Sequence, residues 1–344
     1  MILDYAAVTA LWLSIIVYAT LGGADFGGGI WYLFTFGKRK NDQRSLIASA
    51  IGPVWEANNV WIIYLIVGLY VTFPTVSAVL ATSLFIPFTL ALIGIVLRGA
   101  SFAFESHISE ALAARAIWGQ LFSTASIIAP FFFGTSAAAV ASGQIRVVHG
   151  NIPVAVFSPW LTPFAIVIGL LALAICSSLA AVYLTVEAER RKDMELENAF
   201  RTRAFIALGA IAILGIVAFI LASSEATILW NGLIHQALWA IIVTILLGIA
   251  TAGALFFKRY KIARILIIME TGAILGTWGL AQNPYLIPPD ITLTSAASPP
   301  ITMQEFLISA VIGMSILVPS MWFLFHVFKG VNRTPRVHEK KVEA

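Results

Sequence analysis

The chain has 344 residues, of which 60% are hydrophobic and only 11% are charged, and its formal net charge is +4 at pH 7. Soluble globular domains are about 25% charged. The composition therefore excludes a soluble protein and predicts an integral membrane protein that crosses the bilayer several times.

Nine apolar segments are long enough to cross about 30 Å of hydrocarbon as helices that rise 1.5 Å per residue. In chain order they cover residues 5–36, 46–72, 77–103, 117–142, 161–186, 204–222, 234–257, 262–281 and 304–328. The first would form a helix of roughly 48 Å, so we expect it to tilt, protrude or break at its glycines. No linker divides the chain, and we predict one all-α membrane domain over residues 1–344.

Lysine and arginine residues predict the orientation of these helices, because cytoplasmic loops carry an excess of them. All of the 21 basic residues except Arg98 and Arg146 follow odd-numbered helices or lie in the C-terminal tail. We therefore predict that the N-terminus lies outside and the C-terminus in the cytoplasm. The net charge is read as a topology signal, and nothing indicates nucleic-acid binding.

The residues that usually hold metals are scarce in the apolar segments. Cys176 is the single cysteine, which excludes an intrachain disulfide and a cysteine metal site. Of the histidines, only His235 and His326 lie near predicted helices, each at an end, and they form no convincing pair of haem ligands. We predict that this chain binds no metal and carries no catalytic residue of its own.

Two acids lie inside the first two predicted helices. Asp25, in GGADFGGG, precedes Lys38 by 13 residues, and Glu56, in GPVWEANNVWII, follows Arg44 by 12 residues. At 1.5 Å per residue these separations are about 20 Å and about 18 Å. Because consecutive helices joined by a short loop are antiparallel neighbours, we expect both carboxyls near mid-membrane, facing each other or a shared cavity.

Other intramembrane groups have two interpretations each. Gly23 and Gly27 form a small-xxx-small pair, which lets another helix approach closely. The two acids either form a buried hydrogen-bonded pair that only stabilises the bundle, or carry protons, since ionisable groups in membranes are usually functional. Arg98 either extends to the interface or is a fixed counter-charge. Glu270 is interpreted mostly as an interfacial or helix-pairing acid.

Several stretches, taken together, resemble subunit II of cytochrome bd-type quinol oxidases. They are GGADFGGG, GPVWEANNVWII, LRGASFAFE and NPYLIPPDITLTSAASPP, in this order, followed by a last helix that contains Pro319. The most specific element is a tryptophan-acid-x-Asn-x-Val-Trp motif, formed here by Trp55, Glu56, Asn58, Val60 and Trp61.

The resemblance implies a haem-free subunit that packs against subunit I, which holds two b-type haems, haem d and the quinol site. Such a complex lies in the prokaryotic cell membrane, oxidises quinol, reduces dioxygen to water and takes protons from the cytoplasm. The resemblance assigns a proton path to Asp25 and Glu56, with Trp55, Asn58, Trp61 and Arg98 in support. It leaves open a small accessory membrane subunit, the type of quinone, and bound quinone or lipid.

The chain also departs from the family pattern. Gly22 stands where many members have a further acid, and Phe102 to Glu105 read Phe-Ala-Phe-Glu where many members read Phe-Glu-Phe-Arg. Whether Glu105 or Glu270 pairs with Arg98 therefore stays open. The alternative function is a proton-coupled secondary transporter, which would need interrupted helices in corresponding halves. A structural scaffold would differ from the oxidase subunit only in acids that do not conduct protons.

Overall fold

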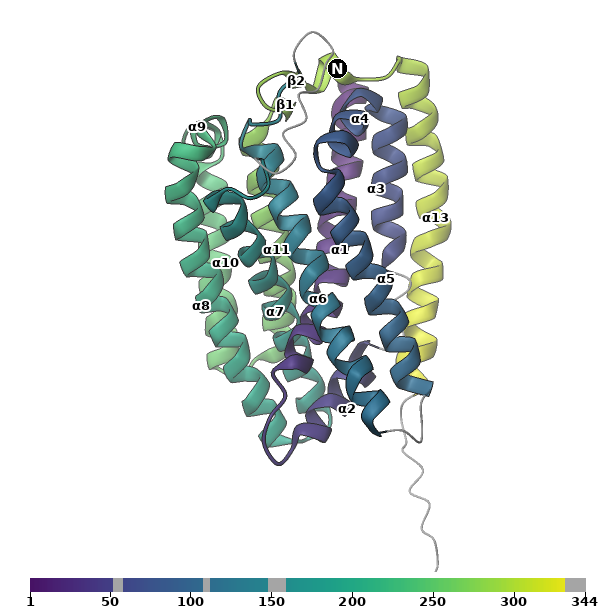
Figure 1. Ribbon diagram of the computed structural model, residues 1–344, viewed down its shortest axis with the longest axis vertical. Coiled ribbons are helices and arrows are strands. Elements are labelled where there is room, and N and C mark those ends of the chain that lie inside the picture. Colours follow the sequence, from purple (N-terminus) through teal and green to yellow (C-terminus); the bar gives the residue numbers. More distant parts are fainter. Residues whose placement is uncertain (52–57, 108–111, 148–158, 332–344) are drawn as a thin grey trace, which may run out of the picture.

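The computed structural model describes residues 1–51, 58–107, 112–147 and 159–331 of the chain. Long helices lie side by side along the long axis of the molecule, and the N-terminus lies at the opposite end from the end of the last helix (Figure 1). The bounds of the helices are α1 Ile2–Leu33, α2 Lys40–Ile51, α3 Asn59–Thr72, α4 Pro74–Ser83, α5 Phe85–His107, α6 Leu112–Ala141, α7 Pro163–Arg190, α8 Met194–Glu225, α9 Thr227–His235, α10 Leu238–Phe256, α11 Tyr260–Gln282, α12 Leu293–Ala296 and α13 Pro300–Val331.

The prediction of an all-α polytopic membrane protein is confirmed. In the described part of the chain, eight helices are long and apolar enough to cross a membrane, namely α1, α5, α6, α7, α8, α10, α11 and α13. The number rises to nine if α3 and α4, which meet at an angle of 120°, are counted as one span.

The predicted continuous helix over residues 77–103 is wrong, because α4 ends at Ser83 and α5 begins at Phe85. Pro87 explains the break, since its ring would clash with the carbonyl of Ser83 four residues earlier and it has no N–H to donate. Leu84, between the two helices, has φ −113° and ψ 23°.

The predicted segment 46–72 is also divided. Its start belongs to α2, residues 52–57 lie outside the described part of the chain, and α3 covers only 14 residues. α3 stops before Phe73, whose φ of −136° and ψ of 64° lie outside the helical region that the following proline, Pro74, disfavours for this residue. By contrast, α1 is continuous through its glycines, which excludes a break and leaves tilting or protruding as the alternatives for this long helix.

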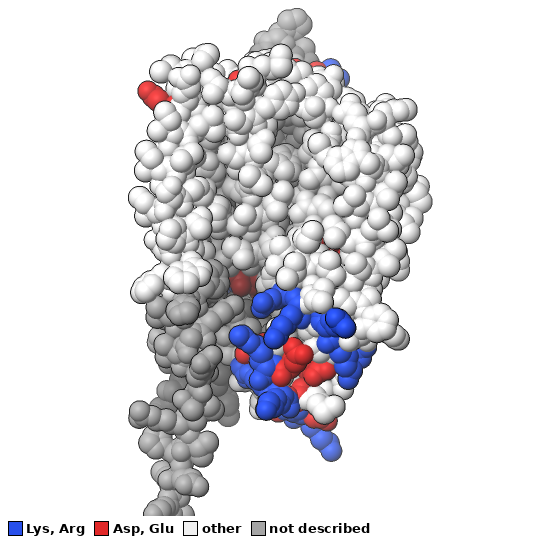
Figure 2. Space-filling model, turned by 180° about the vertical axis from the view of Figure 1, so that it is seen from behind, with Lys and Arg blue, Asp and Glu red and all other residues white. Residues whose placement is uncertain are grey.

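Basic side chains gather at the end of the bundle opposite the N-terminus (Figure 2). The segments that carry them are 38–44, 190–203 and 258–264. This distribution agrees with the loop pattern from which the orientation was predicted. Which end faces the cytoplasm stays a prediction.

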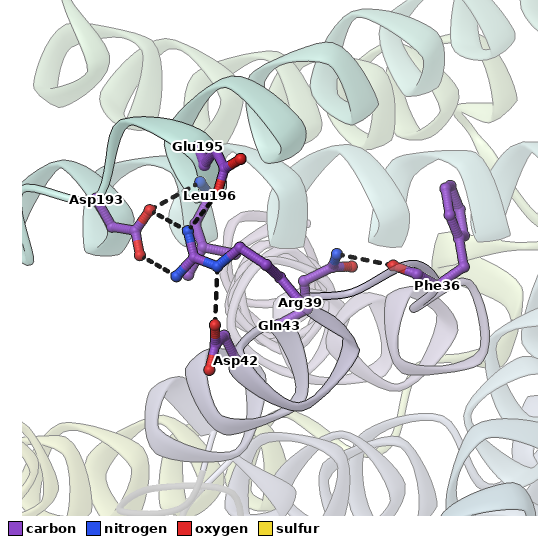
Figure 3. A network of polar contacts seen from close by, with 7 residues as sticks. All are labelled: Phe36, Arg39, Asp42, Gln43, Asp193, Glu195 and Leu196. Atoms are coloured by element: carbon purple, nitrogen blue, oxygen red, sulfur yellow. Dashed lines mark hydrogen bonds and ion pairs between the residues drawn. The ribbon is translucent and has the colours of Figure 1, made fainter.

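A network of charged side chains ties the turn after α1 to the turn before α8 at this basic end (Figure 3). The guanidinium of Arg39 donates to Asp193 at 2.7 and 2.5 Å, to Asp42 at 2.8 Å and to Glu195 at 3.0 Å. Asp193 also caps α8 by accepting from the backbone N–H of Leu196 at 3.2 Å. The hydrogen bonds from Arg39 lower the pKa of Asp193 to about 2.

The other end is closed by the long connection after α11, which the sequence predicts as a surface loop. Its strands β1 (Tyr285–Ile287) and β2 (Ile291–Thr292) pair antiparallel. The guanidinium of Arg146 binds the carboxylate of Asp290 at 2.9 and 3.2 Å, which ties this hairpin to the loop after α6.

Candidate functional site

Close packing of α1 on α7 positions Asp25. A Cβ atom at Gly27 would overlap the backbone carbonyl of Cys176, and one at Gly23 would lie 3.2 Å from Cδ1 of Leu179. The predicted close approach at these two glycines is therefore confirmed, with α7 as the partner helix. Asp25 lies between them on the chain, and its side chain is buried, at 8% exposure.

Asn58, from the tryptophan-acid motif, binds the carboxyl group of Asp25. Nδ2 of Asn58 donates a hydrogen bond to Oδ2 of Asp25, and both side chains are buried. Asn58 is the residue directly before α3. The glycine-rich part of the first predicted helix and the polar motif of the second thus meet inside the bundle. Trp55 and Glu56 lie outside the described residues.

Arg98 places a positive charge beside this pair. Its side chain is 6% exposed, and its guanidinium carbon lies 4.9 Å from the ring centroid of Phe26 and 5.6 Å from that of Phe122. The charges of Arg98 and Asp25 interact electrostatically. Extension of Arg98 to the interface is thus not observed, and the structure favours the interpretation as a fixed counter-charge.

Glu270 has a different partner. Its side chain is 4% exposed and accepts a hydrogen bond from Oγ1 of Thr251 on α10 at 3.1 Å. Gly248, also on α10, leaves room for it, because a Cβ atom there would lie 3.1 Å from Oε1 of Glu270. Glu270 therefore pairs α11 with α10, as one of its two interpretations predicts. The side chain of Glu105 lies outside the part of the chain described in atomic detail.

Trp61, three residues after Asn58 on α3, has an indole nitrogen that is buried without a hydrogen-bond partner among the described residues. Tyr18 on α1 interacts electrostatically with Arg98 and Asp25. The sequence interpretation did not include Tyr18, although it precedes Asp25 by seven residues, a spacing that places both on nearly the same helix face.

Metal-binding side chains do not gather in the described part of the chain. His235, in the last turn of α9, is exposed, the side chain of His326 lies outside the part described in atomic detail, and no group of three or more His, Cys, Asp or Glu side chains among the described residues could hold a metal ion. That this chain binds no haem stays a prediction. What the cluster offers is a carboxyl group flanked by an amide and a guanidinium. Of these three groups, the carboxyl group can take up and release a proton.

Comparisons with known proteins agree on one family. The family model described as "Cytochrome bd terminal oxidase subunit II" matches residues 3–328. A protein of Bacillus subtilis (strain 168), provisionally named a cytochrome bd menaquinol oxidase subunit II, is 25% identical, over 97% of each chain. "Cytochrome bd-I ubiquinol oxidase subunit 2" of Escherichia coli (strain K12) is 21% identical, over 96% of this chain and 97% of its own.

A solved structure has the same fold. The bd oxidase from Geobacillus thermodenitrificans contains a chain that superposes with a TM-score of 0.79 at 18% sequence identity. The match covers 95% of this chain and 99% of that chain, so the fold is shared over nearly the whole length of both.

Proposed function

Because the chain belongs to the family of cytochrome bd terminal oxidase subunit II, we propose that it is the haem-free subunit of a bacterial quinol oxidase. In this proposal the complex oxidises quinol and reduces dioxygen to water, and subunit I carries the two b-type haems, haem d and the quinol site. This chain stabilises subunit I in the inner membrane and supplies a cytoplasmic proton path through Asp25 and Glu56.

The observation that carries the proton path is the buried pair of Asp25 and Asn58 beside Arg98. Burial in a medium of low dielectric constant favours the neutral carboxylic acid, whereas a hydrogen bond from Asn58 and the charge of Arg98 favour the carboxylate. The carboxyl group of Asp25 is thus exposed to influences in both directions. A proton-transfer group needs both states to be accessible.

Support for Glu56 comes from its place in the chain. It precedes Asn58 by two residues in the same motif. Since Asn58 binds Asp25 directly, we place Glu56 in the same path, next to Asp25. That the carboxyl groups of Asp25 and Glu56 lie close together is part of this proposal.

Exposed apolar faces support a partner subunit. α13 exposes Ile308, Val311, Ile312 and Ile316, and α3 beside it exposes Ile63, Ile66 and Val67, as expected of surfaces covered by lipid or by another membrane subunit. A small accessory subunit and bound quinone or lipid stay predictions of the resemblance.

The test replaces one of the two acids at a time by its amide, which cannot release a proton in the same way. Glu56→Gln and Asp25→Asn should each lower oxygen consumption and proton uptake severely while haem content and assembly stay near normal, and Glu56→Asp should be milder. Full oxygen consumption per mole of haem d in Glu56→Gln and Asp25→Asn would contradict the proton path. If the acids serve only structure, any loss should follow the loss of assembled complex.

The transporter alternative finds no specific support. It would need interrupted helices in corresponding halves of the bundle. The first helix, in which the glycines suggested such an interruption, is continuous from Ile2 to Leu33. Among the described residues one apolar span is broken, where α3 and α4 meet at 120°, and it is the one bent pair found there.

A further inference from the structure

Tyr18 points along α1 toward Asp25. It precedes Asp25 by seven residues, or about 10.5 Å of helical rise. Its ring lies over Gly22, one turn closer to Asp25, where a Cβ atom would be only 3.2 Å from Cε2 of the ring. Edge-on contacts with Phe26 on α1 and Phe133 on α6, at centroid distances of 6.5 and 6.1 Å, hold the ring in place.

Tyr18 and Arg98 both pack against the ring of Phe26, and both have buried polar atoms. The hydroxyl oxygen is buried without a hydrogen-bond partner in the described part of the chain, and the same holds for Nε and Nη2 of Arg98. Tyr18 interacts electrostatically with Arg98 and with Asp25. The phenol, the guanidinium and the carboxyl group thus act on one another.

Packing alone does not explain the oxygen atom of Tyr18. A buried polar group without a partner destabilises the folded chain. Phenylalanine at this position would keep the contacts of the ring with Phe26 and Phe133 and would avoid that cost. The hydroxyl of Tyr64 on α3 is buried without a partner as well, so what distinguishes Tyr18 is its electrostatic interaction with Arg98 and Asp25.

We propose that the hydroxyl of Tyr18 is a further proton-relay group, which takes the proton onward from Asp25; this inference rests on the proton path proposed above. Asp25, as the carboxylic acid, gives its proton to the oxygen of Tyr18, directly or through one water molecule. At the same time the hydroxyl proton of Tyr18 passes to a water molecule on its far side. The phenol is neutral before and after the step, and the carboxylate left on Asp25 stays beside the positive charge of Arg98.

The test is Tyr18→Phe in the assembled oxidase complex, which removes one oxygen atom and keeps the ring. We expect oxygen consumption per mole of haem d and proton uptake, followed with a pH-sensitive dye, to fall about tenfold. This is less than the 10²–10⁴-fold that a general acid or base usually contributes, because water can partly replace a hydroxyl. Haem content should match the wild type.

Tyr64→Phe is the matched control. The hydroxyl of Tyr64 on α3 is likewise buried without a partner among the described residues, and its ring stacks on Phe306 at 5.7 Å. Among the described residues, no charged group acts on this hydroxyl. We therefore expect Tyr64→Phe to leave oxygen consumption and proton uptake unchanged.

The outcomes separate the relay from the path as a whole. Full activity of Tyr18→Phe while Asp25→Asn is slow would overturn the relay and leave the proposed function standing; full activity of both would overturn both. Equal slowing of Tyr18→Phe and Tyr64→Phe would also overturn the relay.

Tyr18→His, which keeps an exchangeable proton, should be faster per haem than Tyr18→Phe. If it is equally slow, or if Tyr18→Phe loses assembled complex at normal turnover per haem, the hydroxyl is structural.

Discussion

Replacing Gly27 by alanine tests the packing on which the position of Asp25 depends. A Cβ atom at this position would overlap the carbonyl group of Cys176 and would lie 2.7 Å from Cβ of Ala180, both on α7. A backbone carbonyl cannot move away from an added methyl group by a change of rotamer, as a side chain can. We therefore expect α1 and α7 to separate by on the order of 1 Å, because tightly packed interiors have no spare volume to absorb a methyl group.

The expected loss follows from this geometry. Inserting a methyl group into a well-packed interface typically costs about 1–3 kcal/mol. At about 2–4 °C per kcal/mol, the thermal midpoint should fall by several degrees. Since Asp25 is two residues away on the same helix, the separation also shifts its carboxyl group relative to Asn58. Gly27→Ala should therefore lower oxygen consumption per haem as well as stability.

The assay is thermal unfolding of the detergent-solubilised complex, together with oxygen consumption per mole of haem d. The control is Gly215→Ala on α8, where a Cβ atom would meet no atom within 4 Å. That change should be neutral or stabilise the helix by at most about 1 kcal/mol. If the thermal midpoint and turnover of Gly27→Ala equal those of Gly215→Ala, the reasoning is refuted.

Three further predictions concern the whole chain. Because Arg39 lowers the pKa of Asp193 to about 2 from an ordinary 3.8, their interaction stabilises the fold above about pH 4 and is lost as the pH falls toward 2. The difference in thermal midpoint between wild type and Arg39→Ala should therefore shrink between pH 5 and pH 2.5, and a constant difference would count against this linkage. The chain expressed alone should contain no haem by pyridine haemochrome analysis, which stoichiometric haem would disprove. Without a haem-bearing partner the chain should also aggregate on size-exclusion chromatography, and a stable monodisperse peak would argue against dependence on subunit I.

The sequence predicted the fold class because hydrophobic runs of membrane length carry a strong signal. It was less successful where a proline acts locally. Residues 77–103 are apolar throughout, and the break at Leu84 depends on the clash between Pro87 and the carbonyl of Ser83. That clash is a property of backbone geometry, which average hydrophobicity does not register.

The candidate site was predictable only in part. Asp25 and Asn58 are conspicuous because acids and amides are rare in apolar segments, and the structure joins them by a hydrogen bond. Tyr18 gave no such signal, since tyrosine is common in membrane helices and its role depends on Phe133, which is distant in the chain. The burial of Arg98 likewise depends on helices that its local sequence does not specify.

The glycines of α1 and the polar cluster depend on each other physically. Gly27 brings the backbones of α1 and α7 together and Gly23 packs against side chains of α7, which leaves little room for water or lipid between these two helices near Asp25. In such an environment of low dielectric constant, charges act on one another more strongly than they do in water. We therefore expect gain or loss of a proton at Asp25 to change its electrostatic interaction with Arg98 and Tyr18, whose polar atoms are also buried. A packing change that admits water should weaken this coupling even where every polar side chain is kept.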